Sequence, residues 1–152
     1  MPIPEMQNGL LPPGVHDCSI EEARTRFGSF QGSDRRPRMF AKLEQYLKEV
    51  RTTRLVASVI LDRSFVTTIP DPNDIDLVLL LRPGHDFSAV LRPFEYNVLS
   101  GVQVRKRYQM DAFTAVEGSE VAAEYLDFFS QVRGERTRRK GLLRVTLFDE
   151  IS

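Results

Sequence analysis

Residues 55–81, LVASVILDRSFVTTIPDPNDIDLVLLL, decide the fold of this chain. They contain two short apolar runs, 55–61 and 77–81, in which Val, Ile and Leu predominate. Runs of this length and composition predict strands that are buried on both faces of a sheet. The residues between them are rich in Pro, Asp, Asn and Thr, which predicts a polar, turn-rich connection between the two strands.

Amphipathic helices are predicted on both sides of this pair of strands. Ser19 and Glu22 have the spacing of a capping box, so a short helix is expected to begin there and to end near Phe27. Residues 38–51 and 119–132 carry apolar side chains at helical spacing, with Ser119 as a capping residue. The aromatic residues of these helices are predicted to be core residues: Phe40, Tyr46, Tyr125, Phe128 and Phe129.

The remaining segments complete an α/β (α+β) domain, a mixed sheet flanked by helices. Residues 1–18 are predicted to be an N-terminal loop segment, and residues 19–152 to form one domain. Four further expectations concern single segments: a turn at 28–34, a helix within 87–99, one or two strands within 102–113, and a basic loop at 133–141 before a final strand at 142–148.

Composition limits the class of protein. The chain has 152 residues, of which 41% are hydrophobic and 28% charged, as expected for one globular domain. Its 21 basic and 21 acidic residues balance, which argues against a general binder of nucleic acids or membrane surfaces. Cys18 is the only cysteine, and no apolar run reaches the length of a membrane span. We therefore predict a cytoplasmic protein with no internal disulfide and no membrane association.

The charges are unevenly distributed. Residues 62–76 hold four acidic side chains and one basic one, residues 35–54 hold seven basic and two acidic, and residues 133–144 hold six basic and one acidic. An acidic cluster between two basic segments suits a metal ion together with an anionic ligand. Solvated faces explain the same charges without any site, so the sequence leaves both interpretations open.

Two aspartates at the start of the second apolar run carry the chemical signal. In a strand, Asp74 and Asp76 would project to one side about 6–7 Å apart, with Ile75 turned into the core. Two carboxylates held so close repel each other unless a cation lies between them, and their oxygens suit Mg²⁺ or Mn²⁺. Asp111 lies in a later predicted strand and is the candidate third ligand. Such a set predicts a two-metal site for phosphoryl or nucleotidyl transfer.

The same residues form a known pattern. A strand ending near Ser64, nine intervening residues, Asp74-Ile75-Asp76, a second strand and a later Asp111 resemble the polymerase-β-like nucleotidyltransferase superfamily. The chain is most similar to its minimal, single-domain bacterial and archaeal members. The resemblance also covers LPPGVHD (11–17), YQMDAF (108–113) and RRKGLLRVTL (138–147).

The resemblance implies roles for these residues. Ser64 would bind a nucleotide phosphate, Asp74 and Asp76 would hold two Mg²⁺ ions, and Asp111 would bind the ion nearest the attacking hydroxyl. The reaction would transfer a nucleoside monophosphate from a nucleoside triphosphate, with ATP among the candidate donors, to a hydroxyl on a protein or RNA acceptor. A partner protein or a second copy of the chain would complete so small a site.

One residue departs from the family pattern. Arg63 stands immediately before Ser64, where the family usually has glycine. Its side chain either obstructs the approach of the phosphates or binds them through its guanidinium group. The alternative prediction is therefore a catalytically inactive interaction protein on the same fold, such as an antitoxin or a defence-system partner.

Overall fold

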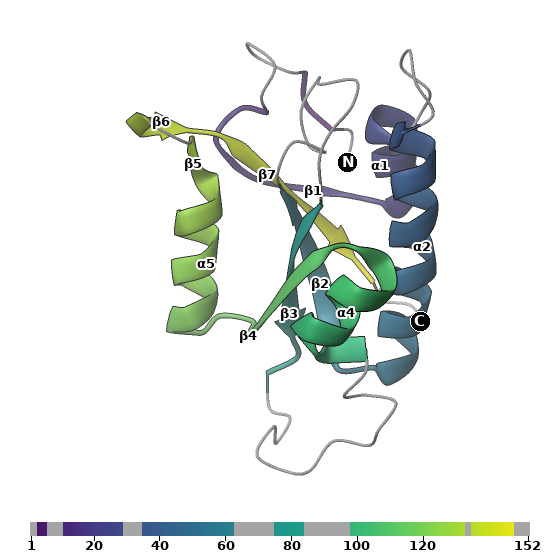
Figure 1. The fold of residues 1–152 in the computed structure, drawn as a ribbon. Coiled ribbons are helices and arrows are strands. Elements are labelled where there is room, and N and C mark those ends of the chain that lie inside the picture. The colour runs from purple at the N-terminus through teal and green to yellow at the C-terminus, as the bar shows by residue number, and fades with distance from the viewer. Residues whose placement is uncertain are drawn as a thin grey trace.

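The two apolar runs pair with each other near the centre of a five-stranded sheet. In the computed structural model, β2 (Val56–Asp62) and β3 (Asp76–Leu81) are antiparallel neighbours, and the sheet has the order β1-β7-β2-β3-β4 (Figure 1). The β3–β4 and β1–β7 pairs are parallel, so the sheet is mixed as predicted. The structure describes residues 3–5, 11–28, 35–62, 75–83, 98–132 and 135–147.

Three further strands complete the five-stranded sheet. The edge strands of the sheet are β1 (Gly14–Cys18) and β4 (Asp111–Val116), and β7 (Gly141–Thr146) lies between β1 and β2. A separate two-stranded sheet consists of β5 (Gln131–Val132) and β6 (Glu135–Arg139). The helices are α1 (Ile20–Phe27), α2 (Arg35–Thr53), α4 (Gly101–Tyr108) and α5 (Glu120–Ser130).

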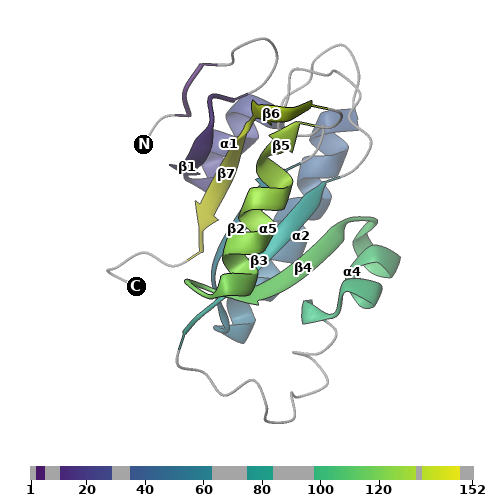
Figure 2. The same cartoon turned by 90° about the vertical axis from the view of Figure 1, so that its left-hand side faces the viewer.

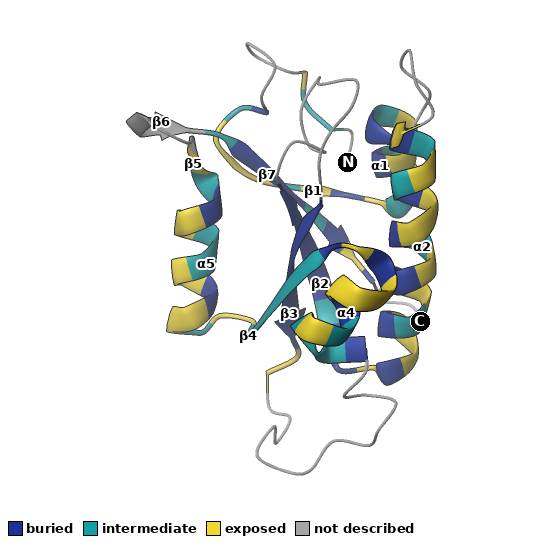
Figure 3. Ribbon diagram, viewed as in Figure 1, coloured by how far each residue is buried: buried dark blue, intermediate teal, exposed yellow. Residues whose placement is uncertain are grey.

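The helices form layers on the two faces of the sheet. Helices α1, α2 and α4 pack on one face and α5 packs on the other (Figures 1 and 2). Successive side chains of a strand point to opposite faces, so Leu77 and Leu79 join the core under α2, whereas Val78 and Leu80 join the core under α5. Both predicted apolar strands are therefore buried on both faces, as the dark colour of the central strands shows in Figure 3.

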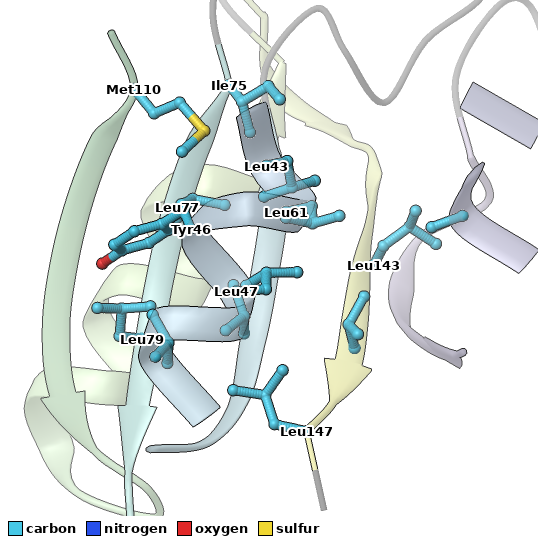
Figure 4. Close-up of a cluster of buried hydrophobic side chains, with 14 of the residues drawn as sticks. Leu43, Tyr46, Leu47, Leu61, Ile75, Leu77, Leu79, Met110, Leu143 and Leu147 are labelled. Carbon is cyan, nitrogen blue, oxygen red and sulfur yellow. The ribbon is translucent and has the colours of Figure 1, made fainter. Parts of the chain in front are cut away.

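The three amphipathic helices predicted at 19–27, 38–51 and 119–132 correspond to α1, α2 and α5 of the structure. Ser19 accepts a hydrogen bond from the Glu22 amide, and the Glu22 carboxylate accepts one from the Ser19 amide, which completes the capping box at the start of α1. In α2 the predicted stripe is buried, and the hydroxyl of Tyr46 donates to the Val98 carbonyl at 2.7 Å. Figure 4 shows how Leu43, Tyr46 and Leu47 of α2 meet the leucines of the central strands.

The predicted N-terminal loop contains a strand instead. Residues 14–18 form β1, which runs parallel to β7, and the Gly141 amide donates to the Leu11 carbonyl at 2.9 Å. Gly141 is required there because a Cβ at this position would lie 2.1 Å from the Pro12 carbonyl oxygen. The sequence conceals β1 because this short edge strand is largely exposed and has no apolar alternation.

Two further segments differ from their predictions. Residues 102–108, in the segment expected to contain one or two strands, belong to helix α4, with Val104 and Tyr108 buried one turn apart and Val102 75% exposed, whereas residues 111–113 of that segment begin β4. The segment expected as a basic loop contains β6, whose pairing with β5 no local pattern could reveal. The predicted turn beyond Gly28 and nearly all of the predicted helix within 87–99 lie outside the described residues.

The prediction that Phe128 is a core residue is also wrong. Phe129 is buried and faces Phe113 of β4 with 5.4 Å between ring centroids. Phe128 is 65% exposed and meets the edge of Phe129 instead. Among the described helices α5 is the one that packs on this face of the sheet, and only the stripe of α5 that meets the strands is buried.

We expect Leu79→Ala to destabilise the fold by about 2–5 kcal/mol, because Leu79 is fully buried and its truncation leaves a cavity in the central strand. Urea denaturation measures the change in the free energy of unfolding. The control is Val102→Ala at an exposed position of α4, which should change it by less than about 0.5 kcal/mol. Equal effects of the two substitutions would contradict the placement of β3 in the core.

We expect the thiol of Cys18 to react slowly in the folded protein. Cys18 is buried at the end of β1, and burial raises the pKa of its thiol to about 12, so little reactive thiolate forms near neutral pH. Labelling with a disulfide reagent at pH 8 should be slow for the native chain and fast in denaturant. Rapid labelling of the native chain would show that β1 does not pack as described.

Candidate functional site

Three aspartates meet at one end of the sheet. Asp62 ends β2, Asp76 begins β3 and Asp111 begins β4; Asp62 pairs with Asp76, and Asp76 pairs with Asp111. Directly paired residues on neighbouring strands lie about 5 Å apart and project to the same face. The register therefore gathers three carboxylates into one row, which we call the acidic edge.

The acidic edge lies on the face that α5 covers. Asp76 alternates with Ile75 and Leu77, which are buried in the core under α2. The inward turn of Ile75 agrees with the prediction from the sequence. On the α5 side, Phe113 stacks against Phe129, so the last turn of α5 lies close to the start of β4.

The three carboxylates differ in exposure. Asp62 and Asp76 are 4% and 3% exposed, whereas the side chain of Asp111 remains 42% exposed. Burial of an ionised carboxylate is costly unless a cation or hydrogen-bond donors compensate it. The acidic edge thus has two buried carboxylates and one that solvent or a ligand can reach.

Lys140 supplies a positive charge on one side of the acidic edge. Its ammonium nitrogen lies 2.9 Å from Oδ1 of Asp62, and its backbone amide donates to the Ser130 carbonyl at the end of α5. On the other side, Nη1 of Arg105 lies 3.9 Å from Oδ1 of Asp111. The sequence does not reveal Lys140 as the partner of Asp62, because the two residues are distant in the chain and come together through the pairing of β2 with β7.

A cavity of about 120 Å³ lies at the same end of the sheet, on the opposite face. We call it the basic cavity; its described lining residues are Arg35, Arg38, Met39, Lys42, Ile75, Tyr108, Gln109 and Met110. Ile75 and Met110, which Figure 4 shows at the same end of the sheet, directly precede Asp76 and Asp111 in the chain. Both basic segments of the sequence therefore come to this end of the sheet: Lys140 contacts Asp62, and the basic residues of α2 line the cavity on the opposite face.

The structure describes only part of the predicted site. It brings Asp76 and Asp111 together, whereas Arg63, Ser64 and Asp74 lie outside the described residues. No group of three or more His, Cys, Asp or Glu side chains with the geometry of a metal site occurs in the described part of the chain. Carboxylate oxygens such as those of Asp76 and Asp111, which the register places side by side, are of the type that binds Mg²⁺.

The sequence of the chain matches one protein family. A model of a family of unknown function, DUF6932, matches residues 4–146. The chain belongs to this family. The match includes every element of the sheet, the acidic edge and the basic cavity. No curated protein and no solved structure matches the chain. None of the helices in the described ranges is long and apolar enough to cross a membrane.

We expect Lys140→Met to destabilise the protein by about 3 kcal/mol, because it leaves the buried carboxylate of Asp62 without its ammonium partner. The double variant Asp62→Asn/Lys140→Met should recover part of that loss, since it removes the buried charge. Thermal or urea denaturation provides the measurement, with Lys106→Met on the exposed side of α4 as the control. A double variant that is less stable than Lys140→Met would contradict this account of the ion pair.

Proposed function

We propose that the chain is a magnesium-dependent nucleotidyltransferase that transfers a nucleoside monophosphate from a nucleoside triphosphate to an acceptor hydroxyl. The observation that carries the proposal is the pairing of Asp76 with Asp111 on neighbouring parallel strands, with Asp76 buried and Asp111 open to a ligand. Such a pair is costly at the start of two strands whose other residues are almost all apolar, and a shared cation would offset that cost.

The carboxylates of Asp76 and Asp111 would hold the metal, together with Asp74, two positions before Asp76 in the chain. When bound there, Mg²⁺ supplies charge neutralisation at the phosphates and activation of the attacking oxygen. Ser64 and Arg63 are proposed to bind the phosphates of the nucleotide. Lys140 keeps Asp62 engaged in an ion pair, so Asp76 and Asp111 form the donor pair of the described edge.

The proposed reaction is a single displacement at the α-phosphorus. The acceptor hydroxyl oxygen forms a bond to this phosphorus, its proton passes to the exposed carboxylate of Asp111, and the bond to the β-phosphate oxygen breaks, releasing pyrophosphate. Asp111 suits this role because its carboxylate is the accessible one of the three. We place the reaction in the cytosol, with ATP among the candidate donors and with a partner protein or a second copy of the chain completing the site.

We expect Asp76→Asn to lower transfer of an α-labelled nucleoside monophosphate by about 100-fold or more, because one oxygen ligand and one negative charge are lost. The assay offers protein and RNA acceptors with each of the four nucleoside triphosphates and Mg²⁺, and a chelator should abolish the signal. The control is Glu124→Gln, which removes an exposed carboxylate from α5 and should leave transfer unchanged.

A thermal-shift measurement separates the two functions that the sequence left open. A nucleotide at 100 times its dissociation constant stabilises the fold by about 2.7 kcal/mol. A Mg²⁺-dependent shift that Asp76→Asn removes, without transfer to any acceptor, would favour an inactive, nucleotide-binding partner protein. No shift and no transfer in the wild-type chain would contradict the proposed function altogether.

A further inference from the structure

The basic cavity is built from one face of the α2 N-terminal half. Arg35, Arg38 and Lys42 follow each other at spacings of three and four residues, which places them on one side of the helix. The described residues that line the cavity include these three cations and no carboxylate. Like charges at this spacing repel, so the arrangement favours an anion in the cavity.

The position of the cavity on α2 strengthens this preference. Arg35 is the first residue of the helix, and no acidic residue occurs before Glu44. The amide groups at a helix N-terminus attract anions and disfavour nearby cations. A bound anion would be stabilised both by the helix and by the three side chains, whereas the cations alone oppose the helix dipole.

Existing contacts hold the cavity walls in place. The ammonium group of Lys42 donates to Oε1 of Gln109 at 2.5 Å, and Gln109 adopts a left-handed backbone conformation, with φ of 61°, at the end of α4. Arg35 and Arg38 each interact with further groups. The cavity is therefore bounded by α2 on one side and by the connection between α4 and β4 on the other.

The cavity adjoins the proposed reaction centre. Ile75 and Met110 line it, and each is bonded directly to an aspartate of the acidic edge, Asp76 and Asp111 respectively. Arg105 of α4 has its Nη1 3.9 Å from Oδ1 of Asp111, and α4 ends at Gln109 in the cavity wall, so the Asp111 carboxylate and the cavity lie at the same end of the sheet. An acceptor whose hydroxyl meets Asp111 can thus place a neighbouring anionic group among the three cations.

We propose that the basic cavity binds a backbone phosphate of a single-stranded RNA acceptor whose 3′-terminal hydroxyl lies at Asp111. The identification of this ligand as the acceptor rests on the proposed function. An RNA end carries a hydroxyl and a phosphate one nucleotide apart, whereas an unmodified protein hydroxyl brings no phosphate. The volume of about 120 Å³ far exceeds the space that one water molecule needs and admits a phosphate group. The balanced charge of the whole chain agrees with recognition of an RNA end by one local site.

Fluorescence polarisation with a 5′-fluorescein-labelled single-stranded oligoribonucleotide, at low salt and without nucleotide, tests the binding. We expect Arg38→Gln/Lys42→Gln to weaken binding about tenfold or more and to reduce the slope of log affinity against log salt by about 1–2. The matched control is Lys48→Gln/Arg51→Gln, which removes two charges from the same helix at residues lining a different groove. The control should change the affinity by less than about threefold. Arg35→Gln, at an exposed position, provides a second test if the double variant folds poorly.

The outcomes distinguish this inference from the proposed function. Equal losses in the two double variants, or no loss in either, would overturn the RNA site. A cavity variant that loses the nucleotide-dependent thermal shift but binds RNA normally would show that the cavity binds the nucleoside triphosphate. That result would also overturn the RNA site. Asp76→Asn should retain RNA binding while losing transfer, which supports both proposals. Cavity-specific RNA binding without transfer by the wild-type chain would support the site and contradict the nucleotidyltransferase.

Discussion

The antiparallel pairing of β2 with β3 is the constraint on which the rest of the structure depends. Its register sets Asp62 opposite Asp76 and, through the parallel pairing of β3 with β4, sets Asp111 beside Asp76. A slip of one residue would exchange the two faces of a strand. The carboxylate of Asp76 would then enter the core under α2, and Leu77 would leave it. The apolar side chains that stabilise the sheet therefore also fix the position of the acidic edge.

The sheet also brings positive charges to the end at which the acidic edge lies. β7 pairs with β2 and brings Lys140 to Asp62, while α2 packs across β2 and β3 and brings its basic first turns to the other side of the strand ends. The chain as a whole carries no net charge, yet opposite charges are concentrated at one end of the fold. This arrangement suits a ligand that carries phosphates and a cation together, which is the chemistry of a nucleotide and of an RNA end.

In the proposed reaction, the two faces of the sheet contribute different groups. The carboxylates lie on the face that α5 covers, and the basic cavity lies on the face that α2 covers. Ile75 and Met110, which line the cavity, directly precede Asp76 and Asp111 in the chain. An acceptor would meet both faces at the strand ends, with its hydroxyl at Asp111 and its phosphate in the cavity. The membership of the chain in DUF6932 covers both features but assigns a role to neither.

The sequence by itself determined the elements whose patterns are local. The two apolar runs, the capping box at Ser19 and the buried stripe of α2 each depend on neighbours within a few turns, and the structure agrees with them. It also indicated Asp76 and Asp111 as candidates, because carboxylates at the start of apolar strands are exceptional. Only the tertiary structure decided that residues 14–18 form an edge strand, that 101–108 form a helix, that Lys140 contacts Asp62, and that the first turns of α2 lie at the same end of the sheet. These features depend on contacts between segments that are far apart in the chain. The packing of the whole domain selects those contacts, so no periodic pattern within one segment predicts them.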